Sequence, residues 1–319
     1  MKLSNRVGQI VATALSLILL SGGGTAATAQ TLTTLYPFSG PPDGKNSVAA
    51  LIADASGALY GTTETGGSGT GCGGGCGTVF KLTPPPKTGG PWIESVLYSF
   101  TNSPDGALPQ ASLIADASGA LYGTTTSGGT GCSSGACGTV FKLTPPPKTG
   151  GPWTENVLYS FTGGSDGGIP LGSLFADASG ALYGTTEVGG SGGGGTVFKL
   201  TPPTPPATTW TVSVLYNFTG GSDGAVPDAG LIADASGALY STTANDGGTG
   251  CSGSGCGTVF KLQLPAIFQG VPGQANCVDQ SIAFIAQQDG GGSIDAAAAA
   301  LGFASVADLQ AAVTSFCTN

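Results

Sequence analysis

Six of the eight cysteines in this 319-residue chain stand in pairs inside glycine-rich loops. The pairs are Cys72 with Cys76, Cys132 with Cys137, and Cys251 with Cys256. A further loop of the same kind, "VGGSGGGGTVF", contains no cysteine. Because both cysteines are missing together, we interpret each pair as one unit, as a disulfide within the loop requires.

Two other chemistries fit these pairs less well. A zinc site needs four ligands, so two loops would have to combine their thiolates while the cysteine-free loop contributes none. A redox centre favours two residues between its cysteines and a βαβ context, whereas here three or four residues separate them. We therefore expect three disulfides within loops and a fourth between Cys277 and Cys317.

Carboxylates recur with the same regularity as the cysteines. Each repeat carries one Asp-Gly pair in a loop, and other acids lie in neighbouring loops; the set is Asp43, Asp105, Asp166 and Asp223, with Glu64, Glu187 and Asp246. Asp-Gly is ordinary turn chemistry. If the four aspartates instead converged around an axis, they could hold Ca²⁺, which favours several oxygen ligands, or accept sugar hydroxyls.

Several function classes are excluded by composition. The chain has no histidine, so it can build neither a Ser-His-Asp triad nor a histidine-ligated metal centre. Acid-base chemistry would fall to carboxylates, tyrosines or lysines. Beyond residue 29, seven lysines face eighteen acidic residues, a balance that gives nucleic-acid binding no electrostatic basis.

The cysteine pairs and the repeated acidic residues belong to a tandem array of sequence repeats. The segment "LIADASGALYGTT" begins at Leu51 and recurs with small changes from Leu113, Leu174 and Leu231. Each copy is followed by a glycine-rich loop and "GTVFKL". The tyrosines of the four copies are 62, 61 and 57 residues apart, so the repeat unit decides the fold.

Each unit contains four candidate strands. "SLIAD" and "ALYGTT" flank an Asp-Ala-Ser-Gly turn and predict a hairpin. "GTVFKL" predicts a third strand that ends at a proline run. Trp92, Trp153 and Trp210 open the fourth, as in "WIESVLYSF". Four antiparallel strands per repeat are typical of a propeller blade.

The two ends of the array complement each other. The last repeat stops after "GTVFKLQLP" without a fourth strand, whereas residues 31–40, "TLTTLYPFSG", match the end of a fourth strand. An N-terminal strand that completes the last blade would remove unpaired edges. We therefore predict an all-β, four-bladed β-propeller of four-stranded repeats, closed by this N-terminal strand.

The ordered words "LYGTT", "GTVFKL" and "VLYSFTGGSDG" resemble the GloVer tandem repeat, found in exported bacterial proteins of the choice-of-anchor type. The resemblance covers roughly residues 31–262. It implies a secreted or surface-displayed repeat protein with no defined biochemical role, and it supplies no catalytic residues to carry over.

Segments at both ends differ from the repeats. Residues 1–29 have a basic start, an apolar run and an Ala-Thr-Ala end, which predicts a cleaved signal peptide and leaves no membrane span in the mature chain. Residues 30–265 form the predicted propeller. Residues 266–319 show helical spacing, with Ser293 and Ser305 as N-cap candidates, and predict a small helical domain stapled by the last disulfide.

We expect a secreted, extracellular, surface or periplasmic monomer that acts as a noncatalytic binding module, with a glycan or a protein as its partner. The alternative is an exported carbohydrate-active enzyme with paired carboxylates. Near-identical acids in every repeat argue against it, because catalysis needs carboxylates in different environments. For the repeated lysines of "VFKL" we expect a solvated strand face, and for the tryptophans packing between blades.

Overall fold

The computed structural model describes residues 30–131, 137–148, 150–234, 237–248, 255–264 and 305–318. The predicted signal peptide and most of the predicted helical domain lie outside these ranges. The chain divides after Leu35, and the unit that begins at Tyr36 contains every strand and helix described below.

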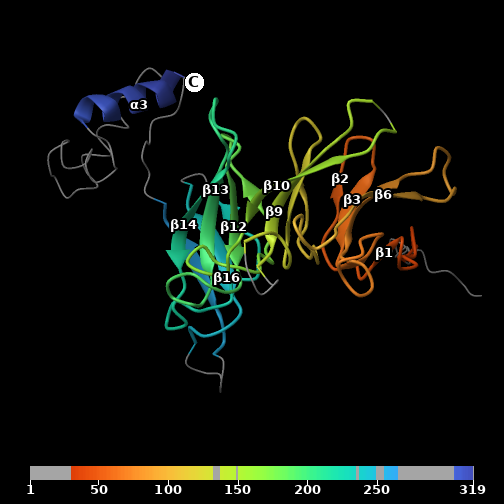
Figure 1. The fold of residues 1–319 in the computed structure, drawn as a ribbon, viewed down its shortest axis with the longest axis horizontal. Helices are drawn as coiled ribbons and strands as arrows, with labels where there is room; N and C mark the ends of the chain where they lie inside the picture. The colour runs from red at the N-terminus through yellow and green to blue at the C-terminus, as the bar shows by residue number, and fades with distance from the viewer. Residues whose placement is uncertain are drawn as a thin grey trace, which may run out of the picture. The chain divides into compact units, whose positions relative to one another are not determined.

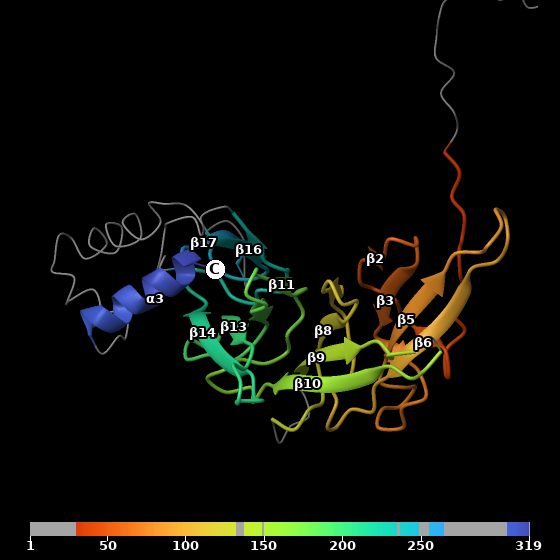
Figure 2. The same ribbon diagram turned by 90° about the horizontal axis from the view of Figure 1, so that it is seen from above.

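The repeats form antiparallel sheets (Figures 1 and 2). The first sheet has the order β2 (Ile52–Ala53), β3 (Leu59–Thr63), β5 (Thr78–Thr83), β6 (Ile93–Ser99). The second consists of β7 (Ile114–Ala115), β8 (Leu121–Thr125), β9 (Thr139–Thr144), β10 (Thr154–Ser160). The third consists of β11 (Phe175–Ala176), β12 (Leu182–Thr186), β13 (Thr196–Thr201), β14 (Thr211–Asn217). The predicted strand order within a repeat is confirmed.

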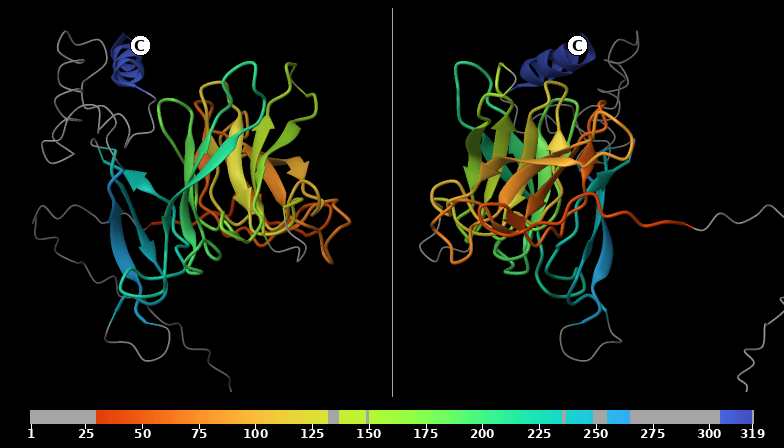
Figure 3. Two further views of the ribbon diagram at one scale, coloured as in Figure 1. Left: turned by 60° about the vertical axis from the view of Figure 1, so that its left-hand side comes forward. Right: turned by 90° about the vertical axis from the view of Figure 1, so that its right-hand side faces the viewer.

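The fourth sheet has three described strands, β15 (Ile232–Ala233), β16 (Leu239–Thr243) and β17 (Thr258–Leu262). A separate short ladder pairs β1 (Gly44–Lys45) with β4 (Thr65–Gly66). Figure 3 shows the strands from two further directions.

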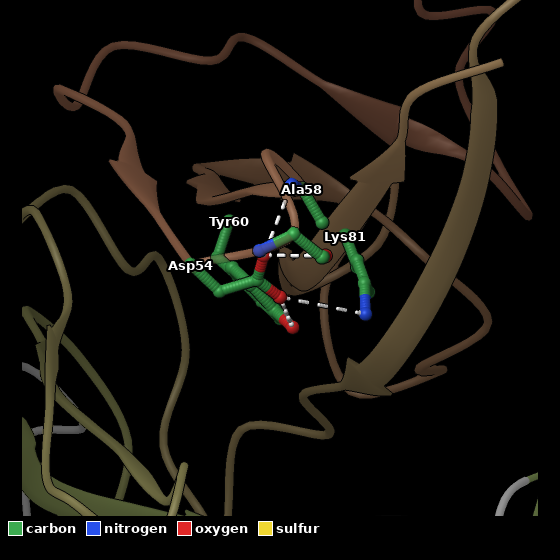
Figure 4. Close-up of polar contacts among 5 residues, drawn as sticks. Asp54, Ala58, Tyr60 and Lys81 are labelled. Atoms are coloured by element: carbon green, nitrogen blue, oxygen red, sulfur yellow. Dashed lines mark hydrogen bonds and ion pairs between the residues drawn. The ribbon is translucent and has the colours of Figure 1, made fainter. Parts of the chain in front are cut away.

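The hairpin turn of each repeat is built by its aspartate. Asp54 Oδ1 accepts hydrogen bonds from the Ser56 hydroxyl (2.6 Å) and the Ala58 amide (3.0 Å), and Oδ2 accepts one from the Tyr60 hydroxyl (2.9 Å) (Figure 4). The hydrogen bond from the Ser56 hydroxyl is the largest of the effects that lower the pKa of Asp54 to about 2. Gly57 has φ +79°, a conformation that favours glycine. The sequence "DASGALY" therefore specifies this turn.

The repeated lysine of "VFKL" lies over the tyrosine of the same repeat. The Lys81 ammonium is 5.1 Å from the centre of the Tyr60 ring and 3.8 Å from Asp54 Oδ2 (Figure 4). The same ring contact recurs for Lys142, Lys199 and Lys261. We expected the lysines to lie on a solvated strand face. In the structure, this face is partly covered, because each lysine lies over an aromatic ring.

The core lies between consecutive sheets. Phe100 from the end of β6 packs edge-on against Phe141 of β9, with ring centres 5.0 Å apart, and both rings are fully buried. Phe161 with Phe198, and Phe218 with Phe260, repeat this contact at 5.1 Å. Each fourth strand therefore ends in a ring that joins its sheet to the next.

The N-terminal segment differs from the expectation. Residues 31–40 form no strand in the structure, and β17 is an edge strand of its sheet. Val259 of β17 is 83 % exposed, whereas its counterparts Val79, Val140 and Val197 are fully buried. Phe38 instead packs against Phe80 of the first sheet, with ring centres 4.9 Å apart. Among the described strands, no ladder pairs residues 31–40 with β17, so closure of the ring stays a proposal.

The described part of the C-terminal segment is α3 (Val306–Thr318). Ser305 precedes it and its carbonyl accepts the amide of Leu309 (3.2 Å), as expected at a helix start. Leu309 and Val313 of this helix are fully buried. Within the described residues, no helix has the length and apolar character needed to cross a membrane.

Candidate functional site

The Asp-Gly aspartates hold the corner that follows each fourth strand. Asp105 accepts hydrogen bonds from the Tyr98 hydroxyl (2.7 Å), the Thr101 hydroxyl (2.7 Å) and the Thr101 amide (3.0 Å), and it is 5 % exposed. Equivalent tyrosine bonds reach Asp43, Asp166 and Asp223. These carboxylates are used internally, which is the turn chemistry of our first interpretation.

The structure does not bring the four aspartates together as a metal site. In the part of the chain that is described, no group of three or more acidic or cysteine side chains is placed to hold a metal ion.

The other predicted acidic residues lie in separate environments. Glu64 accepts a hydrogen bond from Gln110 (3.1 Å). Partial burial and the charge of Glu187 raise the pKa of Asp228. Asp246 has a backbone φ of +58° and forms an isolated β-bridge with Gly255.

Replacing Asp105 with alanine is expected to lower the unfolding free energy by about 2 kcal/mol, because it removes a buried acceptor from the part-buried hydrogen bonds of Tyr98 and Thr101. The matched control is Asp223→Ala in a more exposed corner, where water can replace the carboxylate and the loss should stay below about 1 kcal/mol. Urea unfolding of the two variants measures the difference. Equal losses would contradict a role that depends on burial.

The first loop disulfide is present as predicted, between Cys72 and Cys76. Cys137 and Cys256 are disulfide-bonded as well. Their predicted partners, Cys132 and Cys251, lie outside the described residues, as does the predicted bridge between the side chains of Cys277 and Cys317.

A groove that the sequence did not reveal runs along β6. Its volume is about 640 Å³. Two acidic residues, Asp43 and Glu94, and two aromatic residues, Tyr98 and Trp153, contribute to its lining, together with Ser68 and Ser99. Asp43 comes from the N-terminal corner, Glu94 from β6 itself, and Trp153 from the segment before β10. The repeat array thus brings three separate segments to one concave surface.

The two carboxyl groups in this groove have opposite electrostatic environments. Glu94 Oε1 is buried without a hydrogen-bond partner, and burial together with the charge of Asp43 raises the pKa of Glu94 to about 7. Burial also acts on Asp43, but hydrogen bonds from Ser39, Gly44 and Tyr36 outweigh it and lower its pKa. At neutral pH, Asp43 is ionised, whereas Glu94 is divided between its neutral and charged forms.

Trp153 has two roles in the structure. It packs against the hydrophobic cluster shared by the first and second sheets, beside Leu97 and Tyr98, as expected for packing between repeats. It also lines the groove along β6. The one sequence signal for the site was the spacing Trp-x-Glu, which occurs at Trp92 and Trp153 but not at Trp210.

The sequence matches a family described as the Gloeobacter/Verrucomicrobia repeat over residues 23–174 and 131–271. No curated protein matches the chain. Among solved structures, a protein titled a putative gluconolactonase shares 16 % identity, with 66 % of this chain and 58 % of that chain covered and a TM-score of 0.37.

A gluconolactonase from Xanthomonas campestris shares 15 % identity over 62 % of this chain and 57 % of that chain, with a TM-score of 0.36. A putative glucose dehydrogenase from Thermus thermophilus shares 16 % identity over 68 % of this chain and 84 % of that chain, with a TM-score of 0.30. The chain spans a little over half the length of the two gluconolactonase structures.

Proposed function

The chain belongs to the Gloeobacter/Verrucomicrobia repeat family, and we propose that it is an exported, noncatalytic protein that binds carbohydrate as a monomer. The observation that carries the proposal is the groove along β6, where two aromatic rings lie beside two carboxyl groups of different protonation. Export rests on the signal sequence at residues 1–29.

Three features of the groove suit a sugar. Its volume of about 640 Å³ is in the usual range for small-ligand sites. Trp153 and Tyr98 provide flat apolar rings with polar edges, which can pack on the carbon-bound face of a sugar ring. Glu94 lines the groove, and because its Oε1 has no donor in the structure, its carboxyl group has acceptor capacity left for a sugar hydroxyl. The charge of Asp43 disfavours anionic ligands.

For the fold, we propose that the four sheets are blades of one propeller and that residues 31–37 form the fourth strand of the last blade. Two observations support closure. Tyr36 and Phe38 repeat the contacts that end β6, with a hydrogen bond to Asp43 and an edge-on ring contact to Phe80. The exposed face of Val259 on β17 is where the other repeats hold their fourth strand.

Electrophoresis in native gels cast with hydroxyethyl cellulose, laminarin or xylan tests the function. We expect at least one polysaccharide to retard the protein, and Trp153→Ala and Glu94→Val to weaken retardation about tenfold. Valine stands at the position of Glu94 in the third repeat, so this variant is compatible with the fold. Trp92→Ala, outside the groove lining, should behave like the wild type. Equal retardation of the wild type and Trp153→Ala would contradict the proposal.

One observation favours a second function. Carboxyl groups whose pKa values are pushed apart are the pattern of an acid and a base, and Asp43 and Glu94 show it. The alternative is therefore an exported glycoside hydrolase. Release of nitrophenol from aryl glycosides by the wild type, lost in Glu94→Gln, would replace the binding proposal with this one.

A further inference from the structure

We propose that a second carbohydrate site of the same kind lies along β10, so that one chain carries two binding sites. The inference rests on the proposed function of the groove along β6. The second site is built from Glu155 and Asp105, with the rings of Tyr159 and Trp210. Each of these residues stands one repeat after its counterpart in the first groove.

The buried, unpartnered glutamate of the first groove recurs along β10. Glu155 Oε1 is buried and has no hydrogen-bond partner, like Glu94 Oε1. Burial and the charge of Asp105 raise the pKa of Glu155 to about 7. Asp105 is in turn held by the Tyr98 hydroxyl, as Asp43 is held by Tyr36. A buried acceptor without a donor is uncommon in proteins, and this chain places one at the same position of two consecutive repeats.

The walls of the two sites also correspond. Trp210 packs against the same hydrophobic cluster as Leu158 and Tyr159, and Trp153 packs against the same cluster as Leu97 and Tyr98. On the other side, the Thr130 amide donates to the Ser160 hydroxyl (3.4 Å), and the Ser68 amide donates to the Ser99 hydroxyl (3.2 Å). The aromatic residues and the serine hydroxyl that flank the first groove thus both have counterparts along β10.

The third repeat lacks two of these components. Val212 stands where the first two repeats have glutamate, and it packs into the hydrophobic cluster of the second and third sheets. The chain has three tryptophans, so no fourth one follows β14 to form the aromatic wall. The number of sites is therefore two, although the number of repeats is four. Two sites on one chain would raise the affinity for a polysaccharide above that for a short oligosaccharide.

Isothermal titration calorimetry of the full chain with cellohexaose, laminarihexaose and xylohexaose counts the sites. We expect two molecules per chain for the wild type, one for Glu94→Val, one for Glu155→Val, and none for the double variant. Val212→Ala is the matched control and should keep two. Thermal melts of every variant verify that the fold is retained.

The outcomes separate this inference from the proposed function. One molecule per chain in the wild type, lost in Glu94→Val and unchanged in Glu155→Val, overturns the second site and leaves the first. No binding of any of the three probes overturns both.

Discussion

Replacing Phe141 with alanine is expected to lower the unfolding free energy by about 3–5 kcal/mol, the range for a large aromatic ring removed from a packed core. The ring of Phe141 is fully buried and packs edge-on against Phe100, which ends the fourth strand of the preceding repeat. Its removal therefore weakens two sheets at once. Urea unfolding followed by circular dichroism measures the loss.

The matched variant Phe260→Ala tests closure of the array as well. Phe260 is at the same repeat position on β17, but it is partly exposed because β17 is an edge strand. If residues 31–37 pair with β17, Phe260→Ala should cost nearly as much as Phe141→Ala, and this cost should fall to about 1 kcal/mol when residues 31–39 are deleted. A small cost with and without the deletion would contradict closure, and a small cost for Phe141→Ala would contradict the packing.

The unfolding free energy is expected to fall as the pH rises from 5 to 8. The pKa values of Glu94 and Glu155 are about 7 in the folded protein, above the value near 4.3 of an exposed glutamate. The folded state thus holds these protons more tightly, so their contribution is complete below the unfolded pKa and is lost as pH passes through 7. Both side chains are partly open to water, which reduces the contribution to about 1–2 kcal/mol each.

Asp43 has the opposite effect on the pH dependence of the unfolding free energy, and it does so at lower pH. Its lowered pKa gives stability that is present above the ordinary aspartate value and is lost only as the pH falls below it. The slope between pH 5 and 8 therefore reports mainly the glutamates, and Asp228, whose pKa is also raised, acts in the same direction. The double variant Glu94→Gln and Glu155→Gln should remove most of it. Persistence of the full slope in that variant, or stability that rises toward pH 8, would show that the glutamates are not its source.

The sequence predicted the repeating elements because their signals are local. The turn at Asp54 is specified within seven residues, and the strand of "GTVFKL" ends where proline removes a backbone donor. The pairing of Cys72 with Cys76 is local in the same sense. The strand order within a repeat followed from these local turn and strand signals.

The groove could not be predicted in this way. Asp43, Glu94 and Trp153 are about fifty to sixty residues apart, and they meet because consecutive sheets pack on each other. In the sequence, Glu94 looks like any polar residue on a half-exposed strand. Its significance depends on the burial of one oxygen and on the nearby charge of Asp43, and both are properties of the packed structure. For the repeated aspartates, the sequence left both a turn role and a ligand role open, since a repeated acid can equally be a repeated turn.

The central claim is that the aromatic and carboxyl groove along β6 binds sugar. A glycan array probed with the purified protein and with the Trp153→Ala variant, at equal concentration and with matched thermal stability, tests it most directly. The account predicts that the wild type binds a related set of neutral glycans and that Trp153→Ala lowers this signal to what the proposed site along β10 contributes. A wild-type protein that binds no glycan, or a variant that binds the same set with the same intensity, would contradict it.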